Sequence, residues 1–272
     1  MMGHQNLHTH STFCDGILSA EDMVEAAIKV GCDSLGFSEH SYVEFDPVYS
    51  MTQENTRKYV KEINRLKEKY AGRIEIFLGL ERDYYSEIET DLEFDYILGA
   101  VHHFEKDGLY VCVDNGAEMQ RASVDKYCGG DFYSLAEEYF AVAADIANKT
   151  KADIIGHFDL VAKYNSGGRF FDESHPRYVS AALDAMDELL KKCRLFEVNT
   201  GAMYRMGKTE PYPSIFLLKE LKKRGGEVLL SSDSHSAESL CHEFENMKEL
   251  LKYCGFKYMK RLTATGFVDV EI

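Results

Sequence analysis

The sequence lacks the features that would direct it into a membrane or into a disulfide framework. Its seven cysteines are scattered, odd in number and without a C-x-x-C motif, a pattern typical of reduced thiols. No apolar run approaches the length of a transmembrane helix, and the first residues enter a polar strand almost at once, which leaves no room for a signal peptide. We therefore expect a cytoplasmic protein with no membrane partner.

The sequence is also poor in basic residues. It has 31 Lys and Arg against 46 Asp and Glu, which gives a formal net charge of −15. Such a surface repels phosphate backbones over a long range, so we expect no nucleic acid as the main partner. A small phosphorylated metabolite is an acceptable partner, since bound metal ions would invert the local field. The oligomeric state is not readable from the sequence.

Three common motifs of phosphate and acyl chemistry are missing. There is no Gly-x4-Gly-Lys-Ser/Thr run, no Gly-x-Gly-x-x-Gly run and no Gly-x-Ser-x-Gly turn. Pro-rich and Ser-rich linkers are missing as well, and no repeat of fixed period is visible. Residues 1–272 are therefore expected to form a single domain, at a length that β/α barrels commonly reach.

What the sequence does contain is a regular alternation of apolar strands and amphipathic helices. Strands are predicted at 33–40, 74–80, 96–101, 152–157, 195–199 and 228–232, with a first strand around residues 8–10 and a last short one at 260–265. Helices are predicted at about 19–30, 52–70, 132–150, 176–193, 213–224 and 239–253. About seven βα units indicate an α/β protein with a parallel sheet, either open or closed into a barrel.

Residues 105–130 interrupt this alternation. They combine turn residues and mixed charge without a clear period, which predicts a long irregular segment. Such segments inside a compact domain are usually lids or binding loops. We expect this insertion to overhang the functional site as a lid, and the alternative is a peripheral decoration.

The first dozen residues contain the first candidate site. His8 and His10 stand at i and i+2 of a predicted strand, so their side chains share one face and can converge on one metal ion. Asp15 follows beside Gly16, where the chain can turn and bring a carboxylate back. A grouping of two nitrogens and one oxygen suits Zn, Mn or Fe. The alternative is that the histidines are ordinary strand residues and that Asp15 caps a turn.

Further histidines and carboxylates stand at the ends of the other predicted strands. The carboxyl ends of barrel strands share one face, so we expect one cluster of metal ligands and catalytic residues there. Its nine candidates are His8, His10, Asp15, His40, Glu81, His102, His157, Asp233 and His235. Judged singly, each could be structural. Together they suit two or three ions, and ions that share a water molecule favour phosphoester hydrolysis.

These residues also carry a resemblance to a known family. The runs that carry it are His8-Thr9-His10 with Asp15, Ser38-Glu39-His40, Gly79-Leu80-Glu81, His102, Gly156-His157 and Ser232-Asp233-Ser234-His235. They resemble the four-motif signature of the polymerase and histidinol phosphatase (PHP) superfamily. Residues 97–103, 156–161 and 196–201 look like its histidinol-phosphatase branch, and the similarity spans essentially the whole chain. Glu39 is a departure, because many members have Asp before the histidine of the second motif.

The resemblance implies a distorted, TIM-like (β/α)7 barrel with parallel strands and a centre of two or three divalent ions (Zn, Mn or Fe). It further implies that a metal-bridging hydroxide hydrolyses L-histidinol phosphate to L-histidinol and phosphate, a late step of histidine biosynthesis. By the same resemblance, His8, His10, Glu81 and Asp233 would hold one ion, Glu81, His102 and His157 a second, and Asp15, His40 and His235 a third.

Two arginines are candidate substrate-binding residues. Arg169 and Arg205 lie in predicted loops after the strands at 152–157 and 195–199, on the expected active face. A guanidinium group matches the edge of a phosphate, and Lys163 is a further candidate. The alternative is that these are solvated surface side chains. Candidates for supporting the ligands or protonating the leaving alcohol are His103, Asp159 and Asn199.

Other functions compete with this one. The same chemistry could act on another small phosphate ester such as a nucleoside monophosphate, or on a diester at a nucleic-acid end, although the acidic surface weighs against a nuclease. A rival from a different class is a non-catalytic metal-binding regulatory domain. The completeness of the candidate ligand set stands against that rival.

Overall fold

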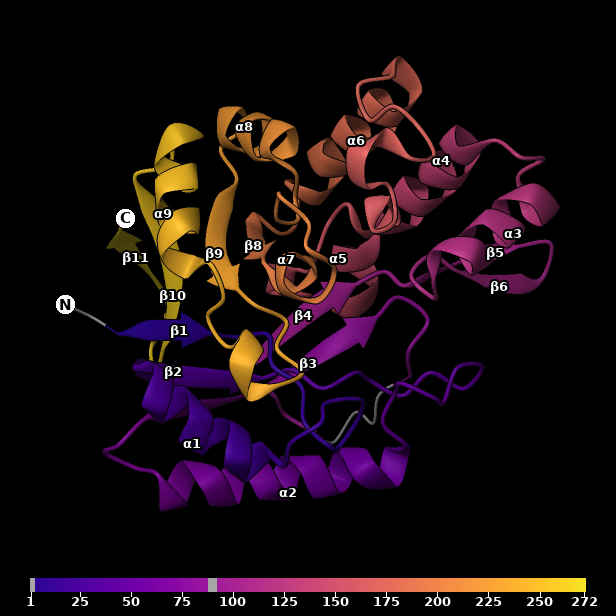
Figure 1. Cartoon of the computed structure of the whole chain (residues 1–272). Coiled ribbons are helices and arrows are strands. Elements are labelled where there is room, and N and C mark those ends of the chain that lie inside the picture. Colours follow the sequence, from indigo (N-terminus) through magenta and orange to yellow (C-terminus); the bar gives the residue numbers. More distant parts are fainter. Residues whose placement is uncertain (1–2, 88–91) are drawn as a thin grey trace.

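The computed structural model describes residues 3–87 and 92–272 and contains a seven-stranded parallel sheet (Figure 1). Its strands are β1 (His4–Asn6), β2 (Cys32–Phe37), β3 (Glu75–Asp83), β4 (Tyr96–Ala100), β7 (Ile154–Ile155), β8 (Leu195–Asn199) and β9 (Glu227–Ser231). They lie side by side in this order, and every neighbouring pair is parallel. The predicted α/β class with parallel strands is confirmed.

The sheet closes through the segments that follow its first and last strands. Thr9 forms a parallel bridge with Ser234. The amide of His10 donates to the carbonyl of Ser234 at 2.8 Å, and the amide of Ser234 donates to the carbonyl of His8 at 3.0 Å. The strands therefore form a nearly closed, TIM-like barrel, as predicted. The histidines themselves lie beyond β1, which ends at Asn6, so their expected place within the first strand is wrong.

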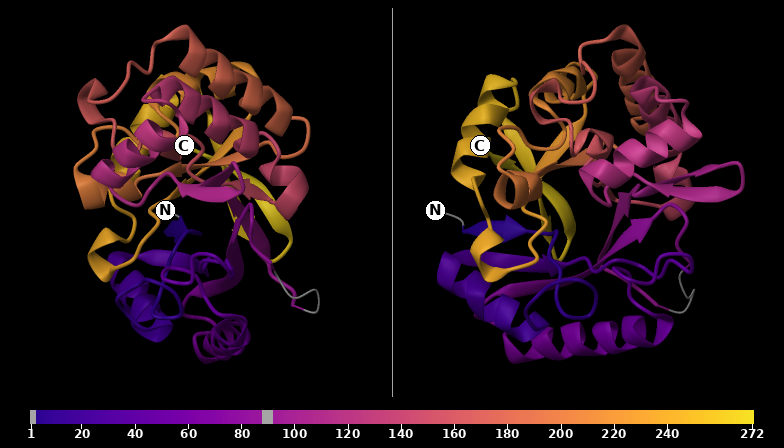
Figure 2. Two further views of the ribbon diagram at one scale, coloured as in Figure 1. Left: turned by 90° about the vertical axis from the view of Figure 1, so that its right-hand side faces the viewer. Right: turned by 45° about the vertical axis from the view of Figure 1, so that its right-hand side comes forward.

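Helices cover the outside of the sheet (Figures 1 and 2). They are α1 (Ala20–Val30), α2 (Gln53–Lys69), α3 (Ala117–Tyr127), α4 (Phe132–Ala143), α5 (Ile146–Thr150), α6 (Pro176–Leu189), α7 (Gly201–Met206), α8 (Ile215–Lys223) and α9 (Phe244–Tyr253). Their ends follow from the sequence. Ser19 accepts the amide of Asp22 at the start of α1, and Gly31 ends that helix with φ of 92°. None of the described helices is long and apolar enough to cross a membrane.

The interior of the barrel is filled around Tyr96 on β4. Its ring lies against Gly79, where an added Cβ would come within 2.2 Å of Tyr96. Its hydroxyl donates to the carbonyls of Leu7 and Phe37 and is thereby satisfied within the core. Glycine in β3 therefore makes room for a tyrosine that joins three strands. The packed interior leaves the carboxyl ends of the strands as the rim on which polar groups gather.

The segment 105–130 is more regular than expected. Strands β5 (His103–Lys106) and β6 (Leu109–Cys112) form an antiparallel hairpin, which is followed by α3. The turn is Asp107-Gly108, both with positive φ, which is a strong hairpin signal. Four-residue strands are too short to show a clear period, and this explains why the prediction of an irregular segment is wrong. Figure 1 shows the hairpin and α3 on the side toward which β3 and β4 point.

Three other predicted elements are corrected by the structure. The helix expected at 132–150 is broken between α4 and α5, where Asp145 accepts the hydroxyl of Tyr84 at 3.0 Å and begins the second helix. The last helix begins at Phe244, after a short 3-10 turn at Ala237–Ser239. The single strand expected at 260–265 is an antiparallel hairpin outside the barrel, made of β10 (Tyr258–Thr263) and β11 (Gly266–Glu271).

Candidate metal centre

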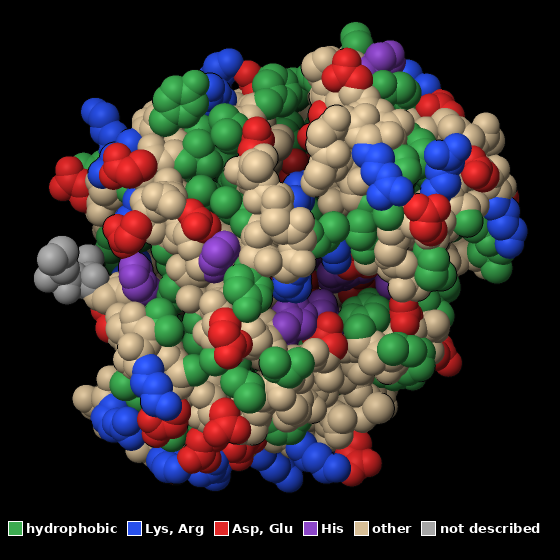
Figure 3. Space-filling model, viewed as in Figure 1, with side chains coloured by type: hydrophobic (Ala, Val, Ile, Leu, Met, Phe, Trp, Pro, Cys, Tyr) green, Lys and Arg blue, Asp and Glu red, His purple; other side chains and the backbone are tan. Residues whose placement is uncertain are grey.

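All nine predicted ligands meet at the carboxyl-end rim of the barrel. Each lies on or just after a strand, except Asp15, which the turn after His10 brings back to the same place. Figure 3 shows histidine side chains gathered in a hollow on this face of the molecule. The structure therefore brings together residues that are more than 220 positions apart in the chain, as the contact of His235 with Asp15 illustrates.

Glu81 on β3 is the centre of the cluster, because five imidazoles surround its carboxylate. The distances from Oε2 are 2.7 Å to His40 Nδ1, 3.3 Å to His8 Nε2 and 3.6 Å to His10 Nε2; those from Oε1 are 2.9 Å to His157 Nε2 and 3.4 Å to His102 Nε2. The Glu81 side chain is fully buried. A carboxylate with different imidazoles on its two oxygens is arranged to bridge two cations, which a single imidazole cannot do.

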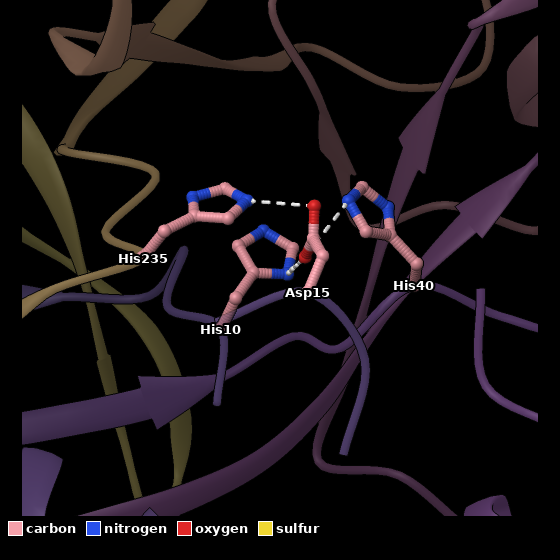
Figure 4. Close-up of side chains that lie close together, drawn as sticks. All are labelled: His10, Asp15, His40 and His235. Carbon is pink, nitrogen blue, oxygen red and sulfur yellow. Dashed lines mark hydrogen bonds and ion pairs between the residues drawn. The ribbon is translucent and has the colours of Figure 1, made fainter. Parts of the chain in front are cut away.

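Asp15 forms a second focus toward solvent (Figure 4). Its Oδ2 lies 3.2 Å from Nε2 of His235, and its Oδ1 lies 3.7 Å from Nε2 of His40 and 3.8 Å from Nδ1 of His10. One ligand atom from each of these four residues lies within 4.8 Å of the others. That spacing suits a single bound cation.

Asp233 forms the third focus. Its Oδ1 lies 3.3 Å from Nε2 of His10, 3.5 Å from Nδ1 of His235 and 3.6 Å from Nε2 of His8. The residue has φ of 45°, in the left-handed region that non-glycine residues rarely adopt. A strained backbone at a ligand position fits a functional constraint, because such strain persists where the surroundings hold the residue in place.

The chemistry of these donors fits divalent transition-metal ions. Among the described residues, Nε2 of His8, Nε2 of His10 and Oε2 of Glu81 are buried without a hydrogen-bond partner. Leaving such atoms unpartnered in a protein interior is costly. Because the three atoms converge on one point, a single bound cation there would give all of them a partner. Imidazole nitrogens with carboxylate oxygens are the ligands that Zn, Mn and Fe accept. The donor set binds divalent metal ions.

Charges in the cluster shift the pKa values of its carboxyl groups. Burial alone would raise the pKa of Glu81, but His40, His8 and His102 outweigh burial and hold that pKa well below its usual range. Burial also opposes ionisation of Asp15, yet the surrounding histidines lower its pKa too. These carboxyl groups are therefore ionised at neutral pH, which is the state that binds a cation.

The histidines of the cluster divide into two groups. Burial lowers the pKa of His102, but its hydrogen bond with Asp83 and the charge of Glu81 together raise the pKa to about 9. For His10, burial and two neighbouring histidines lower the pKa to about 3. His10 is thus ready to bind a cation at any physiological pH, whereas His102 must first lose a proton.

We expect the affinity for zinc to rise with pH. Below about pH 9 a proton occupies His102 when no ion is bound, and an arriving ion must displace it. Burial would lower the pKa values of His8 and His40, but neighbouring carboxylates outweigh burial and raise them as well, so an arriving ion displaces protons from these rings too. The affinity should therefore rise by at least about tenfold per pH unit below the pKa of His102. Chelator competition between pH 6 and pH 8 measures the slope. A zinc affinity that does not change across this range would contradict the assignment of His102 as a ligand.

Two carboxylates that the sequence analysis did not single out hold the ligands in place. Glu197 on β8 accepts two hydrogen bonds from these ligands. Its Oε2 lies 2.8 Å from Nδ1 of His8, and its Oε1 lies 2.6 Å from the backbone nitrogen of His157. Asp83 on β3 lies 3.1 Å from Nδ1 of His102. Each leaves Nε2 of its histidine facing Glu81, which is how carboxylates commonly orient metal-binding imidazoles. A charged residue inside the apolar run of β8 was the available sequence signal for Glu197.

Replacing Glu197 with glutamine should lower the zinc affinity and kcat/KM by roughly 10- to 100-fold. The amide would turn a donor toward groups that now donate to the carboxylate, and His8 would lose its fixed orientation. Chelator competition and steady-state kinetics measure the two effects. The matched control is Glu227→Gln at the start of β9, where the carboxylate pairs with Lys260 at 3.3 Å. Equal behaviour of both variants would argue against the role of Glu197.

The structure separates the two predicted substrate-binding arginines. Arg205 on α7 contacts the centre, with Nη2 2.8 Å from Oδ2 of Asp233 and Nη1 2.9 Å from Nδ1 of His235. Arg169 contacts none of the nine ligands; it pairs with Glu118 on α3 at 2.9 Å and is half exposed. The residues expected to form a loop around Arg205 form a short helix. A role in binding substrate stays a prediction for both arginines.

Comparisons with known proteins agree with the fold and with the binding of divalent metal ions. The family model described as "PHP domain" matches residues 6–201. The histidinol-phosphatase of Bacillus subtilis is 26% identical over 265 residues, which cover 89% of this chain and 97% of that protein. The histidinol-phosphatase of Lactococcus lactis is 27% identical over 268 residues, covering 92% and 90%. The crystal structure of a histidinol phosphate phosphatase from Lactococcus lactis, complexed with zinc, L-histidinol and phosphate, superposes with a TM-score of 0.73 at 22% identity, covering 98% and 100%.

A parallel barrel with histidines and carboxylates gathered at its rim, together with these relatives, defines a metal-dependent hydrolase of phosphate monoesters. The chain belongs to the PHP domain family, and it resembles the histidinol-phosphatase branch of that family.

Proposed function

We propose that this protein hydrolyses L-histidinol phosphate to L-histidinol and phosphate. The observation that carries the proposal is the carboxylate of Glu81, which five imidazoles surround at the rim of the barrel. The choice of substrate rests on the relatives named histidinol-phosphatase, which align over about nine-tenths of the chain. We also propose that residues 1–272 act as one PHP-type domain, because the joined first and last strands make one continuous barrel.

The nine ligands divide naturally into groups for two or three ions. His8, His10 and Asp233 form one group, His40, Glu81 and His102 a second, and His10, Asp15, His40 and His235 a third. Glu81 also lies within 3.6 Å of His8 and His10 of the first group, and His157 lies 2.9 Å from Glu81. Divalent ions bound here would acidify a coordinated water molecule and offset the negative charge on the phosphoryl oxygens.

Basic side chains beside the centre are arranged to hold the phosphate. The side chain of Arg205 is about one-third exposed, and its guanidinium group is oriented by Asp233. Lys163 lies close enough to Arg205 and Asp233 for their charges to act on its pKa, and its ammonium group pairs with Asp114 at 3.2 Å. These two side chains bring positive charge to the site of an otherwise acidic protein. The planar guanidinium group of an arginine can also form two parallel hydrogen bonds with a phosphate.

The segment 105–130 is the proposed lid. Asp114, between β6 and α3, is partly buried; burial alone would raise its pKa, but the charges of Lys163 and, after it, His102 lower that pKa. On the same side, the hydroxyl of Tyr164 donates to the carbonyl of Asp114. The segment therefore reaches the rim with a carboxylate that can face a positively charged leaving group.

A phosphate-release assay on the purified, metal-analysed protein tests the proposal. Histidinol phosphate is compared with AMP and with a chromogenic aryl phosphate. We expect kcat/KM for histidinol phosphate to exceed the others by several orders of magnitude, because only that substrate offers an amine and an imidazole to the site. A flat profile would reject histidinol phosphate as the substrate but keep the phosphoesterase class. No hydrolysis of any ester by metal-loaded protein would favour the non-catalytic regulatory alternative.

A further inference from the structure

Glu39 lies beside a metal ligand and contributes none of its own atoms to the cluster around Glu81. It follows β2, and its side chain is fully buried. Both of its oxygens accept hydrogen bonds from the turn that carries Asp15. Oε2 accepts the amide of Ser11 at 3.1 Å, and Oε1 accepts the hydroxyl of Ser11 at 2.5 Å. The thiol of Cys14 lies 2.7 Å from Oε2 and donates to it.

The turn between His10 and Gly16 depends on these contacts. The carbonyl of Ser11 accepts the amides of Cys14 at 3.1 Å and Gly16 at 3.0 Å, which folds the chain back on itself. The fold is so tight at Gly16 that an added Cβ would lie 2.6 Å from the backbone of Ser11. Holding Ser11 therefore holds the whole turn, and the turn decides where the carboxylate of Asp15 points.

The same contacts orient His10. The Cys14 thiol has a single hydrogen, which it donates to Glu39, so its sulfur is free to accept a hydrogen bond. Nδ1 of His10 lies 3.4 Å from this sulfur. If Nδ1 carries the hydrogen, Nε2 has its lone pair exposed, and Nε2 is the atom that lies 3.3 Å from Asp233. A chain of hydrogen bonds thus runs from Glu39 through Cys14 to Nδ1 of His10, and Nε2 of the same ring faces the candidate metal site.

We propose that Glu39 is a positioning residue for two metal ligands, Asp15 and His10. Its carboxylate fixes the turn that presents Asp15, and it fixes the ring of His10 through the thiol of Cys14. This inference rests on the proposed metal-dependent function, but it concerns metal binding and not the choice of substrate. It assigns a role to the glutamate at which this chain departs from the aspartate of many family members.

Zinc binding by the full-length protein tests the inference. The protein is stripped with a chelator, and the number and affinity of bound zinc ions are measured by competition with a chromogenic chelator. We expect Glu39→Gln to weaken zinc binding by Asp15 and His10 by about 10- to 100-fold, and to leave unchanged the affinity of a zinc ion held by Glu81 and His102. Ser11→Ala, which removes only the hydroxyl contact, should weaken the same binding less. Should Glu39→Gln fail to fold, Ser11→Ala still gives the answer.

A double-mutant cycle separates positioning from general loss of stability. Asp15→Asn should weaken the binding of the same zinc ion. Adding Glu39→Gln should cause a loss smaller than the sum of the two separate losses, because both substitutions act on the carboxylate of Asp15. Glu197→Gln is the matched control, since it acts on His8 and its effect should add to that of Asp15→Asn. Wild-type zinc affinities in Glu39→Gln and Ser11→Ala, or additivity of Glu39→Gln with Asp15→Asn, would overturn the inference. Neither outcome depends on histidinol phosphate being the substrate.

Discussion

Replacing Glu81 with glutamine is expected to reduce kcat/KM for histidinol phosphate on the order of a thousandfold or more. The carboxylate lies within 3.6 Å of a ring nitrogen in each of five histidines, and both of its oxygens are engaged. An amide has no negative charge to share between two cations, and its NH2 group would repel any ion on one side. Steady-state phosphate release, together with metal analysis of the same sample, measures the loss.

The matched control for this variant lies on the same strand. Glu75 is the first residue of β3 and is exposed at the opposite end of the barrel. Glu75→Gln should therefore keep the wild-type rate and metal content. A Glu81→Gln protein that retains full metal content and turns over at the wild-type rate would remove Glu81 from its proposed bridging role.

Removing the metal ions should abolish turnover completely and lower the thermal stability. The ligands come from strand ends throughout the chain, and ions that bind only the folded protein stabilise it by mass action. At a free concentration of 100 times Kd this amounts to about 2.7 kcal/mol, or a rise in Tm of roughly 5 to 10 °C for a chain of this size. Activity and differential scanning calorimetry before and after zinc or manganese is restored measure both effects.

The behaviour of the metal-free protein shows whether the ions serve catalysis alone or also hold the fold together. Circular dichroism should show the same barrel before and after chelation, because the interior is packed around Tyr96 and does not depend on the rim. Turnover by protein shown to be free of metal would contradict the proposed chemistry. Loss of the fold on chelation would show that the ions serve structure as well.

The barrel was predictable because its signal is spread over the whole chain. Each strand is a short apolar run followed by a polar side chain, and the helices have clear apolar stripes, as in α2 with Tyr59, Ile63 and Leu66 buried. The prediction failed for strands of four residues, such as β5 and β6, because a period of two cannot be recognised over so short a stretch. Helix breaks such as that at Asp145 depend on tertiary contacts, which no local pattern contains.

The ligand set could be predicted for the same reason, since parallel strands bring their carboxyl ends to one rim. The carboxylates behind the ligands could not be. Glu197 and Glu39 are recognisable only once His8 and Ser11 are seen beside them, across sequence separations of 189 and 28 residues. Arg205 and Arg169 looked alike in sequence, and only their tertiary contacts distinguish them, because Arg205 pairs with Asp233 and Arg169 pairs with Glu118.

The bridge between Thr9 and Ser234 has a consequence for how the protein matures. It joins the beginning of the chain to its last barrel strand, and both sides of that joint supply metal ligands. The chain must therefore have left the ribosome at least as far as His235 before all nine ligands can meet. The complete set of ions can be loaded only after that point, and a chain truncated ahead of Asp233 would leave the early histidines without their partners.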